Sequence, residues 1–459
     1  MAETRLPVAV AAANPVTADV GAAALRAGGS AADAAVAMVL TSCVAETVFT
    51  GIAGGGFATY VEGATGDTTC VDFFVAVPGL GGTRGHRPRE IEIDFGGQVV
   101  PYAVGAPTVA VPGTPAGVAH LHERWGRLSW ADVVEPALAH AAKGVSFAPL
   151  QSKVLATVAE AMLLGEGDQV YRHGRGVLPG GARLFHPGLE STMLALRDEG
   201  PDAFYHGSIA HQMVAAIGEH GDLGEVDLAA YTVKESRPRV VRLGEAEVRA
   251  RGDDLDDLLG TLAMLELGDD PAAMARSLVR ALRASPKRGD TTSVAVTDSE
   301  GNACAVTTSL GLSSGVWLAD YGIHLNSMLG EAELVRGQLP AGERMGSMMS
   351  PFAAFDDDGL CLVGGAAGGS RIRSALTQVI VNVLHSGMAV PDAIAAPRLN
   401  PVPGRVHVEP GFGETVLAAL APDEVVPWPA LDSYFGGVSA VGRSGPGADP
   451  RRGGAVLSG

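Results

Sequence analysis

Aromatic residues and cysteines are scarce in this chain of 459 residues. Aromatic side chains make up 5% of the sequence, and the four cysteines stand in apolar stretches without the C-x-x-C spacing of a zinc or redox site. We therefore expect buried, reduced thiols and no metal or disulfide. Glycine, in contrast, occurs 62 times, which indicates close packing of small side chains and many tight turns.

Basic residues are also few relative to acidic ones. The chain carries 33 Lys and Arg against 51 Asp and Glu, a formal net charge of −18. A surface this acidic repels phosphate backbones and anionic lipids, so we expect no nucleic-acid partner and no membrane partner. The sequence has no run of about 20 uninterrupted apolar residues and no leader-like start, which predicts a cytoplasmic protein.

The apolar pattern predicts helices and strands in alternating blocks. Residues 17–60 are predicted to form a helical hairpin that leads into a strand. Ser30-Ala31-Ala32-Asp33 has the spacing of a capping box, with Asp in place of the usual Glu or Gln. The helix that follows, at 34–44, has almost no polar face, so we expect it to be buried between layers. Residues 115–220 are predicted to be mainly helical.

A candidate nucleophile, Thr291, lies at the start of a predicted hairpin. Its first strand runs to residue 298, its turn is at 299–302 and its second strand is at 303–308. A threonine needs a base to act as a nucleophile, and no histidine lies near Thr291 in the sequence. Cleavage of the chain before Thr291 would supply one, since the new α-amino group has a reference pKa of ~7.7–8.0. Taken alone, the segment also fits an ordinary Thr-rich hairpin.

Short motifs occur along almost the whole chain in a fixed order. They are Gly28-Gly29-Ser30-Ala31-Ala32-Asp33, Gly51-Ile52-Ala53-Gly54-Gly55-Gly56-Phe57, Val111-Pro112-Gly113-Thr114, Thr291-Thr292, Glu300-Gly301-Asn302, Met349-Ser350-Pro351, Gly368-Gly369-Ser370-Arg371 and Asp449-Pro450-Arg451. Their order resembles the γ-glutamyltranspeptidase family of N-terminal-nucleophile hydrolases. The resemblance implies an α+β fold, a four-layer αββα sandwich in which helices flank two stacked antiparallel sheets.

The resemblance also implies self-cleavage between Asp290 and Thr291. Residues 1–290 would form a large subunit and residues 291–459 a small subunit, and the two would stay associated as one intertwined domain. Thr291 would attack the carbonyl of a small-molecule amide and form an acyl-enzyme, which water or an amine would then release. No cofactor is implied.

Other positions match the family's catalytic residues. Gly368 and Gly369 match its oxyanion-hole pair, whose backbone N–H groups stabilise developing negative charge. In the alternative interpretation, the two glycines only form a turn before a helix. Ser309 stands where the family has a second threonine that hydrogen-bonds the nucleophile.

The substrate-recognition positions depart from the family pattern. The arginine that binds the glutamyl α-carboxylate is Phe74 here, and a ring cannot replace a guanidinium fork. The other substrate-binding candidates are the family's two serines, now Ser347 and Met348, its asparagines, now Asn326 and Gly311, and its aspartate, now Glu331. Glutathione is therefore not the expected substrate. A basic cluster at residues 84–89 could supply a displaced cation or form a solvated loop.

Other functions were weighed against this one. Residues 311–315 fit the G-x-S-x-G pattern of serine hydrolases, but no helix is predicted to follow them. His120 and His122 point apart on a predicted helix, which does not suit a zinc site. An uncut binding module is a further alternative. Within the enzyme class, amide hydrolysis or acyl transfer competes with cleavage of an unusual bond, including carbon–carbon, as in relatives from natural-product pathways.

Overall fold

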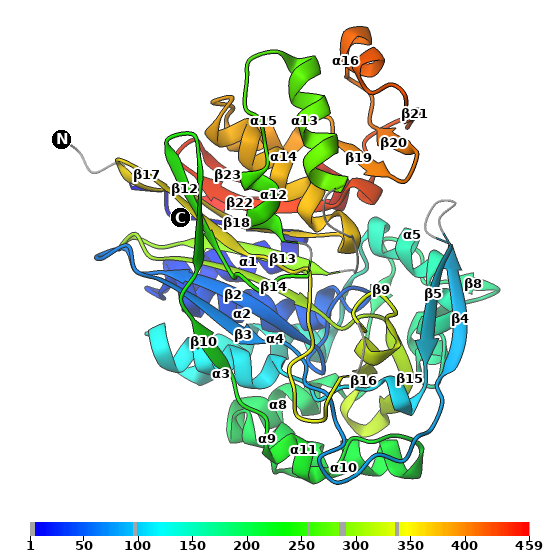
Figure 1. The fold of residues 1–459 in the computed structure, drawn as a ribbon. Helices are drawn as coiled ribbons and strands as arrows, with labels where there is room; N and C mark the ends of the chain where they lie inside the picture. The colour runs from blue at the N-terminus through cyan, green and yellow to red at the C-terminus, as the bar shows by residue number, and fades with distance from the viewer. Residues whose placement is uncertain (1–4, 95–98, 256, 284–290, 336–338, 459) are drawn as a thin grey trace.

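Two antiparallel sheets organise the computed structural model, which describes residues 5–94, 99–255, 257–283, 291–335 and 339–458 (Figure 1). In this part of the chain, the first sheet has seven strands, in the order β10 (Lys234–Ser236), β3 (Thr68–Phe73), β2 (Gly55–Val61), β14 (Ala303–Ser309), β13 (Thr292–Thr297), β1 (Ala9–Ala12) and β24 (Ala455–Ser458). The second has six, in the order β11 (Arg239–Leu243), β12 (Ala246–Ala250), β17 (Phe352–Asp356), β18 (Gly359–Ala367), β22 (Gly437–Gly442) and β23 (Gly445–Ala448).

The two sheets pack face to face through small side chains. Strands β13 and β14 lie against β18 and β22. Ala295, Ala303 and Ala305 belong to the buried cluster between the sheets, whereas the larger Val294 and Val296 point to the opposite face of their strand. A Cβ atom on Gly365 of β18 would lie 2.4 Å from Ser293 Oγ of β13. The abundance of glycine and alanine therefore lets the sheets approach closely.

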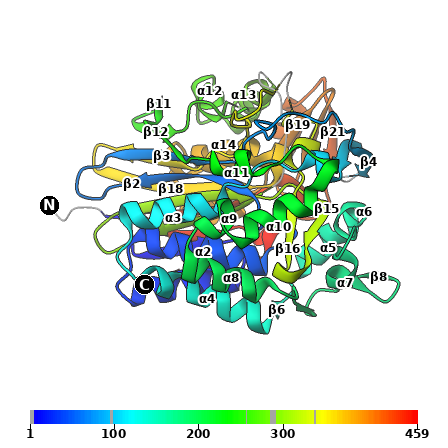
Figure 2. The same cartoon turned by 90° about the horizontal axis from the view of Figure 1, so that it is seen from below.

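Helices cover the outer faces of both sheets (Figures 1 and 2). Helix α2 (Ala31–Ala45) packs on β13 and β14, and α14 (Ile372–Leu384) packs on β18 and β22. All residues of α2 are buried, and the predicted capping box is confirmed, since Asp33 Oδ2 accepts from the Ser30 N–H at 2.8 Å. An apolar helix without a polar face is thus explained by its position beneath α1 and α4, next to the sheet.

The remaining helices form two groups. Residues 114–229, predicted to be mainly helical, contain α3 (Thr114–Trp125), α4 (Trp130–Lys143), α5 (Pro149–Thr157), α6 (Ala159–Met162), α7 (Gly167–Tyr171), α8 (Leu189–Glu199), α9 (Asp202–Tyr205), α10 (Ser208–Ile217) and α11 (Glu225–Ala229). The others are α1 (Pro15–Arg26), α12 (Leu258–Ala263), α13 (Pro271–Arg283), α15 (Val390–Ala395) and α16 (Glu414–Ala419).

Short strands pair outside the two main sheets. They are β4 (Arg89–Asp94) with β5 (Val99–Val104), β6 (Val145–Ser146) with β9 (Arg183–Leu184), β7 (Arg172–His173) with β8 (Gly176–Val177), β15 (Ser313–Leu318) with β16 (Ile323–Asn326), and β19 (Leu399–Val402), β20 (Arg405–Val408) and β21 (Glu424–Pro427) together. The four cysteines are buried and free, as expected. Burial raises the pKa of the Cys70 thiol to about 11.

Candidate active site

Thr291 lies immediately before β13, in the middle of the first sheet, and is 1% exposed. The antiparallel register pairs Thr292 with Thr308, so the next pair along places Ser309 of β14 beside Thr291. The Ser309 Oγ accepts a hydrogen bond from the Gly311 N–H at 3.0 Å. The fold thus brings the two predicted hydroxyl residues together. Asp290, on the other side of the predicted cleavage site, lies outside the described residues.

Gly368 and Gly369 follow the last residue of β18, the strand that packs on β13 and β14. Their φ angles are +124° and +61°, which side chains other than glycine rarely adopt. A Cβ atom on Gly368 would also lie 2.6 Å from the Cα of Gly436. Both positions therefore require glycine, and the backbone turns there into the segment that begins α14.

Two charged residues that sequence reasoning missed hold the residues around Thr291. Arg452 Nη1 donates to the Thr291 carbonyl oxygen at 3.4 Å. Glu46, the residue that ends α2, accepts from the hydroxyls of Thr292 and Thr17, each at 2.7 Å. A signal for Glu46 was present, since it is the only charged residue between positions 34 and 61. No local pattern pointed to Arg452.

The Glu46 carboxyl is buried, which gives a testable pH dependence. Burial raises its pKa above the ordinary 4.5, while hydrogen bonds from Thr292 and Thr17 and the charge of Arg452 oppose the shift. The folded state therefore holds this proton more tightly than the unfolded state. Its contribution to stability is fully present below the ordinary pKa and is lost as pH rises through the folded pKa.

We expect Glu46→Gln to gain stability relative to the unsubstituted protein as pH rises, because glutamine does not ionise. The difference in thermal unfolding midpoint should be larger at about pH 7 than at about pH 4. Glu90→Gln, a change of an exposed residue on β4, is the control and should show no such trend. A difference that is constant or shrinks with rising pH would contradict a buried, ionising Glu46.

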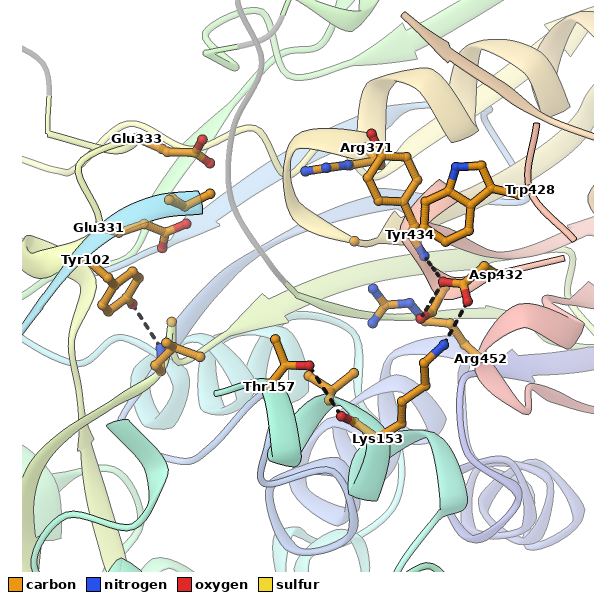
Figure 3. A pocket seen from close by; sticks show the side chains of 16 residues that line it. Tyr102, Lys153, Thr157, Glu331, Glu333, Arg371, Trp428, Asp432, Tyr434 and Arg452 are labelled. Carbon is orange, nitrogen blue, oxygen red and sulfur yellow. Dashed lines mark hydrogen bonds and ion pairs between the residues drawn. The ribbon is translucent and has the colours of Figure 1, made fainter. Parts of the chain in front are cut away.

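A cavity of about 370 Å³ opens beside these residues (Figure 3). Predicted residues on its wall are Gly311, Glu331 and Gly368, and Arg452 joins them. The wall also includes Tyr102, Lys153, Arg371, Trp428, Asp432 and Tyr434. A residue other than glycine at position 311 would crowd the Tyr102 hydroxyl, which would lie 2.8 Å from its Cβ. The cavity is therefore contiguous with the residues around Thr291.

The other predicted substrate residues lie in buried packing. Phe74 stacks on Phe57 with ring centroids 5.4 Å apart, and Met348 belongs to the same apolar cluster. Ser347 Oγ accepts from the Met349 N–H at 3.2 Å. A side chain at position 74 is thus enclosed by core residues, and the ring occupies the space that an arginine would need.

Asn326 braces three segments of backbone. Its side-chain amide donates to the carbonyl oxygens of Ala53 and Ala110 at 2.9 Å and 2.8 Å, and its Oδ1 accepts from the Ala110 N–H at 3.0 Å. These bonds tie β16 to the glycine-rich loop before β2. The structure therefore gives Asn326 a supporting position behind the site.

The alternative interpretations find no support in the geometry. Arg84 binds the carbonyl oxygen of Gly221 at 2.6 Å, and Arg89 pairs with Glu160 on the surface, so this basic segment supplies no cation to the cavity. Residues 313–318 form strand β15, so no helix follows the G-x-S-x-G pattern. His120 contacts Glu235 at 2.7 Å, and His122 contacts the carbonyl oxygen of Leu128 at 2.9 Å.

Within the described ranges, no three or more His, Cys, Asp or Glu side chains gather as metal ligands would. The helices of those ranges include none with the length and apolar character of a membrane span.

Known proteins share this sequence and architecture. A family model described as Gamma-glutamyltranspeptidase matches residues 17–267 and 263–459. The chain belongs to the γ-glutamyltranspeptidase family. It is therefore an enzyme of the group that catalyses amide hydrolysis or acyl transfer, and the family resemblance inferred from the motifs is confirmed.

Individual relatives in this family include both hydrolases and acylases. The glutathione hydrolase proenzyme of Pseudomonas aeruginosa is 29% identical over 470 residues, covering 85% of this chain and 82% of the relative. The Acylase ACY 1 proenzyme of Pseudomonas sp. (strain SE83) is 25% identical, covering 89% of this chain and 85% of the relative. Cephalosporin acylase from Bacillus halodurans shares the fold, with a TM-score of 0.79, 20% identity and coverage of 99% of this chain and 96% of that chain.

Proposed function

We propose that this chain cleaves itself between Asp290 and Thr291 and then acts as an N-terminal threonine hydrolase or acyltransferase on a small amide. One observation carries the proposal. Thr291 stands at the start of the central strand β13, with Ser309 beside it in register and Gly368 at the end of the strand packed behind. A nucleophile, a supporting hydroxyl and backbone donors therefore converge at the edge of one cavity.

The chemistry follows from the new chain end. The free α-amino group of Thr291, with a reference pKa of ~7.7–8.0, takes the proton of the Thr291 hydroxyl as that oxygen attacks the amide carbonyl. The N–H groups of Gly368 and Gly369 stabilise the oxyanion, each by about 3–4 kcal/mol. The proton then passes to the leaving amine. Water or an acceptor amine attacks the resulting ester, releases the acyl group and restores the hydroxyl.

The sheet arrangement supports subunits that stay together. Strands β13 and β14 of the proposed small subunit, residues 291–459, lie between β1 and β2 of the proposed large subunit, residues 1–290. Cleavage before Thr291 leaves these ladders of backbone hydrogen bonds intact. We infer that α2, the two sheets and α14 form the four layers of an αββα sandwich.

The substrate is proposed to be an amide other than glutathione. A free glutamyl α-carboxylate that reached Phe74 would meet aromatic rings and Met348 without a cation to pair with. An unpaired buried charge costs several kcal/mol. The catalytic residues therefore match the family, while the recognition residues have changed.

N-terminal sequencing of the purified protein tests the proposal. The lighter fragment should begin Thr-Thr-Ser-Val, the residues from Thr291 onward. Hydrolysis of a panel of acyl anilides is measured on the same preparation. An uncut chain that hydrolyses amides would overturn the nucleophile assignment, and an uncut chain without activity would favour a binding module.

A further inference from the structure

Opposite charges occupy opposite walls of the cavity beside Thr291 (Figure 3). Glu331 and Glu333 lie on one wall, next to Tyr102. Arg371 and Arg452 lie across the cavity from them, with Trp428 and Tyr434. Lys153 and Asp432, also on the wall, form an ion pair at 2.7 Å and offset each other. The two guanidinium groups therefore define a cationic wall, distinct from the acidic one.

The cationic wall includes a rigid aromatic surface. Trp428 and Tyr434 stack with ring centroids 4.7 Å apart and planes at 23°. The indole N–H donates to His407 Nδ1 at 3.1 Å, and the Tyr434 hydroxyl accepts from Asn400 Nδ2 at 3.2 Å. Both aromatic side chains are thus fixed by partners while they line the cavity, which favours stacking of a flat ligand ring at low entropic cost.

The guanidinium groups lie between this aromatic surface and the catalytic residues. The Arg371 guanidinium carbon stands 4.3 Å above the centre of the Tyr434 ring. Arg452 binds the Thr291 carbonyl oxygen, and its Nη2 would lie 3.2 Å from a Cβ on Gly368. A guanidinium has five donors in a fixed fork that suits a carboxylate, so each of these arginines can hold a ligand oxygen besides its present contacts.

We propose that this cavity binds a flat-ring carboxylate, with the ring against Trp428 and Tyr434 and the carboxylate at Arg371 and Arg452. Combined with the proposed function, on which this step rests, the substrate is an amide that carries an aromatic or heteroaromatic acid. The volume of about 370 Å³ falls in the range of small-molecule sites. The carboxylate site lies on a different wall from the position of Phe74, so it differs from recognition of a glutamyl group.

Binding of unreactive probes tests this inference without requiring catalysis. Naphthalene-2-carboxylate and naphthalene-2-carboxamide share the flat ring and differ in charge. By isothermal titration calorimetry, we expect the carboxylate to bind the purified protein at least tenfold more tightly than the carboxamide. Arg371→Met should remove that preference, and Arg371→Lys should retain part of it. Trp428→Leu should weaken both probes at least tenfold.

Arg280→Met is the matched control, since Arg280 is an exposed arginine of α13 paired with Glu266. It should leave both affinities unchanged, and thermal unfolding should show that every variant is folded. No binding to the unsubstituted protein, or equal binding of the two probes, would overturn the inference. Thr291→Ala should bind both probes as the unsubstituted protein does, so a failure of self-cleavage leaves this result readable.

Discussion

Thr291→Ala is expected to leave the purified protein as one uncut chain of 46.7 kDa and to abolish amide turnover. Alanine has no hydroxyl to attack either the bond before residue 291 or the substrate. Loss of a nucleophile leaves only binding and oxyanion stabilisation, so the rate should fall at least about 10³-fold. Gel electrophoresis, N-terminal sequencing and the rate of anilide hydrolysis measure the three effects.

Thr291→Ser is the matched control for this prediction. It keeps a hydroxyl at the same position, so the chain should still be cut and activity should be retained, at a reduced rate. Thermal unfolding of both variants shows whether either change disturbs the fold. An alanine variant that still matured into two fragments would remove Thr291 from the mechanism.

The second large effect concerns the acyl group. We expect γ-glutamyl-4-nitroanilide to be hydrolysed no faster than butanoyl-4-nitroanilide, which has the same carbon chain without the amino and carboxylate groups. In an enzyme with a guanidinium clamp the charged acyl group gains binding energy, and loss of such a clamp costs several kcal/mol. For this chain we therefore expect kcat/KM for the γ-glutamyl substrate to be at least about 10²-fold below that of a clamped enzyme.

Release of nitroaniline measured over a range of substrate concentrations separates kcat from KM. The butanoyl compound controls for the reactivity of the anilide. Rapid turnover of the γ-glutamyl compound, with a clear preference over butanoyl, would show that a cation elsewhere reads the α-carboxylate. Replacement of the cavity arginines Arg371 and Arg452 would then identify which one.

Local sequence patterns predicted the elements around the site well. The hairpin expected to start at Thr291 is present as β13 and β14, and the capped helix expected at 34–44 is α2, residues 31–45. The helix that follows Gly368-Gly369 is α14. Such elements follow from the alternation of apolar residues, from capping residues and from glycines, all of which act over a few positions.

Contacts between distant segments were not predictable in the same way. Arg452 reaches Thr291 across 161 positions of sequence, and Glu46 reaches Thr292 across 246. Trp428 and Tyr434 meet Arg371 only because the segment after β21 folds back beside the start of α14. An alternating pattern carries no information about which remote side chain will fill the space beside it.

The sequence by itself determined the family, the position of the nucleophile candidate and the loss of the glutamyl clamp, because each is written in a short motif. Only the tertiary structure decided that Phe74 is enclosed by core residues, that Asn326 ties backbone segments together, and that a cationic aromatic wall faces an acidic one. These are properties of packing, in which burial and charge are set by residues hundreds of positions apart.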